Sequence, residues 1–138
     1  MTTPTDNEKQ CSFSLKKDER LCSKKLIEQL FAKGESFLAY PLKVVFLETT
    51  LETKFPAQAA FTVSKKNFKR AVKRNRIKRL MRESYRLNKN PLYITLGNRQ
   101  LAIFFIFIGK ELPVFSRVES AMKKAITKLT SQLEAKEN

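Results

Sequence analysis

Histidine is absent from this 138-residue sequence, and cysteine occurs only twice, as Cys11 and Cys22. Without histidine, the chain lacks the side chain that most often serves as a general acid or base near neutral pH. The two cysteines do not have the spacing of a zinc site, so we expect free thiols in a reducing cytoplasm. These absences argue against a catalytic residue in this chain and against a metal site.

Long hydrophobic stretches are missing as well. The N-terminus, MTTPTDNEKQ, is polar and has no apolar signal-peptide core. Residues 101–108 are apolar, but a membrane-spanning helix needs about 20 such residues. We therefore expect a cytoplasmic protein with no membrane-spanning helix. Residues 1–12 show no hydrophobic periodicity and are expected to form a disordered leader.

Acidic residues are nearly absent from the part of the chain that carries most of its positive charge. Residues 65–89 contain twelve lysines and arginines and one acid, Glu83, which makes +11 of the chain's net charge of +15. Self-repulsion on this scale lowers the stability of a folded protein, so a polyanionic partner is the natural explanation. Nucleic acid is the first candidate and an anionic membrane surface the second.

The hydrophobic pattern predicts one α+β domain over residues 13–135, with a disordered leader before it. We expect an α/β sandwich in which helices pack on one small sheet. The expected order is a helix from Ser23 to Gly34, strands at 36–49 and 57–65, a basic helix at 69–88, a strand at 101–108 and a last helix from Ser116.

Several local features refine this prediction. Pro41 indicates an edge or a bulge in the first strand, which we expect to pair with the second as a hairpin. Ser116 and Glu119 have the spacing of a capping box at the start of the last helix. A short additional strand at residues 92–96 is also compatible with the pattern.

The basic helix is predicted to be amphipathic, because its apolar and cationic residues separate at helical spacing. The buried side is expected to comprise Ile77, Leu80, Met81, Ser84 and Leu87; the outer side comprises Asn75, Arg79, Arg82 and Arg86, with Lys78 alongside and Arg74 and Arg76 on the flanks. A solvated helix face normally mixes charge signs, since like charges four residues apart destabilise a helix. Arginine binds phosphate oxygens in a bidentate fork, which favours nucleic acid over a membrane.

Residues 61–86, FTVSKKNFKRAVKRNRIKRLMRESYR, resemble the signature of the bacterial ribonuclease P protein subunit. Its parts here are Ser64-Lys65-Lys66, Arg74-Asn75-Arg76-Ile77-Lys78-Arg79 and Arg82-Glu83. The stretch SFSLKKDERL resembles the opening of the family before its first helix, and the order of elements agrees across about residues 13–133. The family fold implies a left-handed β-α-β crossover around the basic helix, against the usual rule.

The resemblance implies a ribonucleoprotein endoribonuclease in which RNA is the catalyst and this chain assists removal of the 5′ leader from precursor tRNA. The implied partners are the catalytic RNA and precursor tRNA, with no obligate protein partner. Mg²⁺ would be bound mainly by the RNA subunit and the substrate, and the chain would lower the Mg²⁺ requirement. The implied RNA-binding residues are Lys65, Lys66, Arg70, Arg74, Asn75, Arg76, Lys78, Arg79, Arg82 and Arg86.

The family also holds the leader in a cleft between its first helix and the sheet, and two aromatic residues on that helix are typical. Phe31 matches one of them, whereas the other position holds Ile27. Core packing of Phe31 is an equally good reading of the sequence. Residues such as Phe37, Tyr40 and Phe46 could line the same cleft, but their face is not evident.

Two other functions remain open at this point. The chain could be a ribosomal-protein-like RNA-binding protein with no role in cleavage. It could also be a nuclease acting alone, with Glu83 as its acid. A single glutamate among arginines is more simply explained by an ion pair within the helix.

Overall fold

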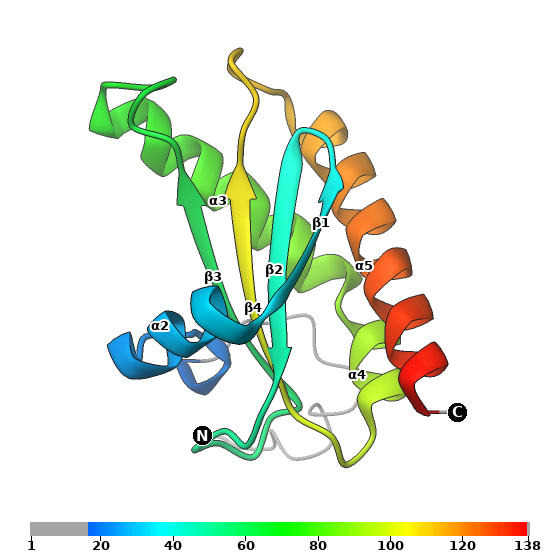
Figure 1. Ribbon diagram of the computed structural model, residues 1–138. Coiled ribbons are helices and arrows are strands. Elements are labelled where there is room, and N and C mark those ends of the chain that lie inside the picture. Colours follow the sequence, from blue (N-terminus) through cyan, green and yellow to red (C-terminus); the bar gives the residue numbers. More distant parts are fainter. Residues whose placement is uncertain (1–16, 138) are drawn as a thin grey trace, which may run out of the picture.

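The computed structural model describes residues 17–137, so the leader expected at residues 1–12 lies outside the described residues. A short 3-10 helix, η1, precedes four α-helices and four strands (Figure 1). The elements in chain order are η1 (Lys17–Glu19), α2 (Lys24–Lys33), β1 (Glu35–Ala39), β2 (Leu42–Glu48), β3 (Ala57–Val63), α3 (Ala71–Asn88), α4 (Asn90–Leu96), β4 (Leu101–Phe107) and α5 (Phe115–Glu137).

The four strands form one mixed sheet in the order β1-β2-β4-β3. Two pairs, β1 with β2 and β2 with β4, are antiparallel, while β3 and β4 are parallel. The expected strand at residues 36–49 is therefore wrong, because the chain reverses at Tyr40 and Pro41 and makes a hairpin of β1 and β2. The expected hairpin of this segment with β3 is also wrong, because β4 lies between them and its apolar residues occupy the centre of the sheet.

Helices cover both faces of the sheet (Figure 1). Helix α2 lies across one face, and α3, α4 and α5 lie on the other. Residues of β4 alternate between the two layers: Ile103 and Phe105 join the core under α3 and α5, while Ala102 joins the smaller cluster under α2. Residues of β4 thus contribute to the core on both faces of the sheet, as its continuous apolar sequence predicts.

The connection from β3 to β4 confirms the expected crossover. In Figure 1 both strands point upward, α3 passes behind the sheet, and β4 lies to the right of β3. This arrangement is a left-handed β-α-β unit, the opposite of nearly all such connections. As a result, the basic helix begins at the end of the sheet where β3 finishes, and it runs along the face away from α2.

The layer beneath α3 and α5 forms the larger core. The last helix, α5, turns an apolar stripe at helical spacing to this core, and its residues are all buried: Val118, Ala121, Met122, Ala125, Ile126, Leu129 and Leu133. In α3, Ile77, Met81 and Ser84 are buried as predicted, and Leu80 packs against the same core. Leu87 is instead exposed, and Tyr85 takes its place with its ring against Phe61 and Phe105.

Two local predictions at the helix ends are wrong. Residues 92–96 belong to α4 rather than to a strand, since Pro91 occupies the first turn, where a missing N–H costs nothing. Helix α5 begins at Phe115, so Ser116 lies within its first turn and is not the cap. Glu119 instead accepts a hydrogen bond from Asn88 Nδ2 at 3.2 Å, which links α5 to the end of α3.

Helix α2 has the limits that the sequence predicts. The Ser23 hydroxyl accepts a hydrogen bond from the Leu26 N–H at 3.2 Å, and the Gly34 N–H donates to the Leu30 carbonyl at 2.8 Å. A Cβ atom at Gly34 would lie only 2.3 Å from that carbonyl oxygen and 2.8 Å from that of Phe46. Glycine is required here because helix and sheet approach so closely, and not because of a left-handed backbone.

A buried ion pair joins the N-terminal segment to the junction of α3 and α4. Lys89 Nζ lies 2.5 Å from Glu19 Oε2, and the Tyr93 hydroxyl donates to the same oxygen at 2.5 Å. Glu19 is 1% exposed and Lys89 2%. Burial raises the pKa of the Tyr93 hydroxyl far above its usual range, and nearby negative charge adds to the shift. This hydroxyl therefore stays protonated and remains a hydrogen-bond donor at any physiological pH.

Candidate RNA interface

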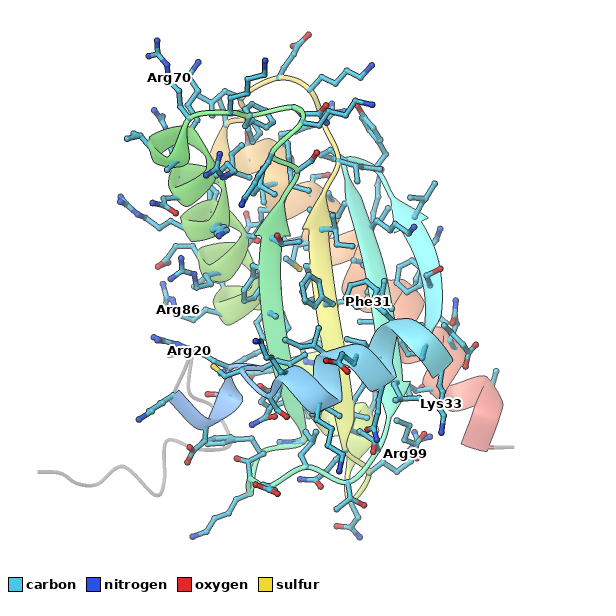
Figure 2. All side chains as sticks on the ribbon, turned by 60° about the vertical axis from the view of Figure 1, so that its left-hand side comes forward. Arg20, Phe31, Lys33, Arg70, Arg86 and Arg99 are labelled. Atoms are coloured by element: carbon cyan, nitrogen blue, oxygen red, sulfur yellow. The ribbon has the colours of Figure 1, made fainter. Side chains whose placement is uncertain are left out.

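The cationic side chains of α3 and of the preceding loop gather on the outer side of the molecule. Figure 2 shows Arg70 and Arg86 at the two ends of α3, projecting away from the sheet. The exposed predicted residues are Lys65, Lys66, Arg70, Asn75, Arg76, Arg79 and Arg82, while Lys78, Arg74 and Arg86 are half-buried. We call these ten residues the docking surface. The structure thus brings together all of the residues predicted to bind RNA.

Two arginines of the docking surface have partners within the chain. Arg74 Nη1 donates to the carbonyl oxygens of Phe68 at 2.8 Å and Lys69 at 2.7 Å, so this guanidinium holds the loop before α3. Arg86 forms an ion pair with Glu83 three residues earlier. The predicted ion pair of Glu83 within the helix is therefore confirmed.

The loop before α3 is fixed in place by residues that the sequence reasoning missed. Asn67 Nδ2 donates to the carbonyl oxygens of Ile108 at 3.4 Å and Gly109 at 3.3 Å. The Phe68 ring is buried, with its centroid 6.0 Å from that of Phe107. The neighbouring cations Lys65, Lys66 and Arg70 therefore stand on an ordered loop, so little chain entropy is lost when they bind a ligand. No local sequence signal marks Asn67, because its partners lie about forty residues away.

The residues predicted for a leader cleft lie on the other side of the sheet, on α2. Phe31 is 53% exposed, and its ring meets that of Phe104 edge to face at 5.0 Å (Figure 2). Phe31 is therefore not a core residue. Ile27, one turn earlier, is half-buried in the small cluster between α2 and the sheet. The two side chains thus form an apolar edge along α2, with only Phe31 offering an exposed ring.

The other aromatic residues considered for this cleft do not share one face. Phe37 and Phe46 pack together at 6.0 Å on the side of α5, so they cannot line a cleft beneath α2. Tyr40 is 61% exposed at the turn between β1 and β2. Phe104, which the sequence reasoning did not select, is the aromatic residue of the sheet that accompanies Phe31.

The side chains of these two surfaces are cationic along α3 and apolar along α2. Within residues 17–137, no group of three histidine, cysteine, aspartate or glutamate side chains is arranged to hold a metal ion. None of the helices in that range is long and apolar enough to cross a membrane. What the docking surface does offer is guanidinium and ammonium groups, which bind phosphate oxygens through charge-assisted hydrogen bonds.

Comparisons with known proteins identify the family of this chain. The family model described as Ribonuclease P matches residues 15–130. The ribonuclease P protein component of Porphyromonas gingivalis is 40% identical over 135 residues, which cover 96% of this chain and 94% of the relative. That of Chlorobium phaeobacteroides is 37% identical over 123 residues, covering 80% of this chain and 84% of the relative.

Solved structures share the fold. The ribonuclease P protein of Staphylococcus aureus superposes with a TM-score of 0.64 at 21% identity, covering 82% of this chain and 95% of that one. The protein from Thermotoga maritima gives 0.63 at 23% identity, covering 80% and 96%. The chain therefore belongs to the ribonuclease P protein family, whose members work with an RNA subunit in processing the 5′ end of tRNA.

Proposed function

We propose that this chain binds the catalytic RNA of ribonuclease P through the docking surface and assists that RNA in cleaving the 5′ leader from precursor tRNA. The observation that carries the proposal is the single-signed outer face of α3, where Arg76, Arg79 and Arg82 are exposed together. Repulsion among these charges lowers the stability of the free protein, whereas the same charges favour binding to the phosphates of RNA. The ordered loop before α3 adds Lys65 and Lys66 to the same surface.

The chemistry of cleavage is assigned to the RNA. Glu83 is the only acid in residues 65–89, and it is paired with Arg86, so it is poorly placed to exchange protons with a substrate. Phosphodiester cleavage commonly relies on metal ions, and the Mg²⁺ ions would be bound by the RNA subunit and the substrate. The chain's cations would offset repulsion between the two RNAs, which lowers the Mg²⁺ concentration that the reaction needs.

The second part of the proposal is that Ile27 and Phe31 hold the single-stranded leader against the sheet. The exposed ring of Phe31 is a platform on which a base can stack, and Ile27 offers apolar contact only. A ribosomal-protein-like RNA binder would share the cationic surface but would have no reason to distinguish precursor from mature tRNA. Leader-dependent affinity therefore separates the two functions.

Replacing Phe31 with alanine should weaken the affinity of the protein–RNA complex for precursor tRNA by about tenfold, the loss of one stacked base. Mature tRNA should bind as before, because it has no leader. The measurement is the equilibrium dissociation constant of each tRNA for the complex of this chain with bacterial ribonuclease P RNA. Ile94→Ala, another exposed apolar residue but on α4, serves as the control.

If the wild-type complex binds precursor and mature tRNA equally, the leader does not touch this protein, and the ribosomal-protein-like function is favoured. If Phe31→Ala weakens both tRNAs alike, the ring supports the structure and not the leader.

A further inference from the structure

Helix α2 covers only part of the sheet face on which it lies. The pairing register places four residues side by side across the strands, in the order β1, β2, β4, β3. This row consists of Leu38, Lys43, Ile106 and Thr62. Leu38 is 54% exposed, and Ile106 and Thr62 are partly exposed. The row therefore forms an open surface with two apolar side chains, Leu38 and Ile106, at the end of the sheet where β3 finishes.

Lys43 is the cation of this row and lies between its two apolar residues, Leu38 and Ile106. Its neighbours in β2, Leu42 and Val44, are buried in the opposite layer, so alternation along the strand directs Lys43 to the α2 face. The side chain is exposed and forms no hydrogen bond or ion pair with any residue that the structure describes. No acid occurs in its row, and the next row consists of Ser36, Val45, Phe104 and Ala60. Lys43 is thus available to an anion from outside the chain.

Lys43 lies one row away from Phe104, the residue that contacts Phe31. Phe104, on which the Phe31 ring rests, belongs to the row adjacent to Lys43, and adjacent rows on one face lie roughly 7 Å apart along a strand. A lysine side chain can span that distance. At the far end of its row, Thr62 lies only three residues before Lys65 in the chain, so the open surface continues toward the docking surface.

We propose that Lys43 binds a backbone phosphate of the single-stranded leader next to the nucleotide whose base lies on Phe31. This inference rests on the proposed function, and it adds a charged contact to a cleft that is otherwise apolar. The partner is RNA rather than an acidic peptide, because an aromatic platform with one adjacent cation matches the repeating base and phosphate of a single strand. Leu38 and Ile106 flank Lys43 in its row with apolar side chains.

The test is Lys43→Met in the complete complex with bacterial ribonuclease P RNA. Methionine keeps the length of the side chain and removes its charge. We expect affinity for precursor tRNA to fall about three- to fivefold, the upper range for an exposed charge pair. The slope of log K against log salt should become shallower by about 0.7, as for one phosphate of a single strand. Affinity for mature tRNA should not change. Lys124→Met, an exposed lysine of α5 on the opposite face, is the control.

A second arm identifies the phosphate. A set of precursor tRNAs would each carry one neutral methylphosphonate in place of a different leader phosphate. At one position this replacement should weaken binding to the wild-type protein but should cause no additional loss with the Lys43→Met variant. If the losses of affinity from the methylphosphonate and from Lys43→Met add in full at every position, the inference is overturned. An equal effect of Lys43→Met on precursor and mature tRNA would also overturn it. If Phe31→Ala remains specific for the leader while Lys43→Met has no effect, only the phosphate contact is wrong. If neither variant affects the leader, the cleft itself is wrong.

Discussion

Replacing Arg76, Arg79 and Arg82 with glutamine should lower the affinity of this chain for ribonuclease P RNA by about a hundredfold, if each guanidinium contributes roughly 1 kcal/mol. These three residues are exposed on the outer face of α3. Glutamine keeps the helix propensity close to that of arginine, so the fold should not change. The slope of log K against log salt should decrease by about two to three, since each lost phosphate contact removes somewhat less than one.

Arg74 is left out of this variant because of its contacts in the structure. Its guanidinium holds the carbonyl oxygens of Phe68 and Lys69, so its replacement would disturb the loop as well as remove a charge. A matched control removes three charges from α5 through Arg117→Gln, Lys123→Gln and Lys124→Gln, all exposed. If the control weakens binding as much as the α3 variant, net charge alone governs affinity, and α3 is not the docking element.

Replacing Lys89 with methionine should destabilise the protein by about 3–5 kcal/mol, the usual cost of removing one partner from a buried ion pair. Lys89 and Glu19 are almost completely buried, so the Glu19 side chain would be left without this partner in an environment from which water is excluded. Since small proteins have a total stability of about 5–15 kcal/mol, this loss is large. Urea denaturation measures it as a lower midpoint at an unchanged slope.

A double variant provides the control. Combining Lys89→Met with Glu19→Leu removes both charges and should recover part of the lost stability, because apolar replacements of a buried pair are often tolerated. If the double variant is as unstable as the sum of the two single variants, Glu19 and Lys89 are not coupled. Thermal denaturation at neutral pH gives an independent measure of the same comparison.

The sequence predicts the basic helix well because all of its information is local. Apolar residues at helical spacing identify Ile77 and Met81 as buried, and the arginines on the other side follow from the same geometry. Leu87, expected on the buried side, is exposed, whereas Tyr85, assigned to neither side, is buried. Tyr85 is directed toward the aromatic rings of Phe61 and Phe105, which are remote in sequence.

The order of the strands could not be predicted from the sequence. The position of β4 between β2 and β3 depends on long-range pairing, and so does the handedness of the crossover, which came only from the family resemblance. Glu19 and Lys89 are 70 residues apart, and nothing in their neighbourhood marks them as a pair. The surroundings of Lys43 could not be predicted for the same reason, since its apolar neighbours Leu38 and Ile106 belong to other strands.

The most direct test of the proposed function is a reconstitution at low Mg²⁺ with precursor tRNA, comparing this chain alone, bacterial ribonuclease P RNA alone, and the two together. We expect cleavage at the mature 5′ end only in the mixture that contains both. A Mg²⁺ titration should show that the chain shifts the concentration needed by the RNA to lower values. Cleavage by the chain without RNA, or no stimulation of the RNA at any Mg²⁺ concentration, would contradict it.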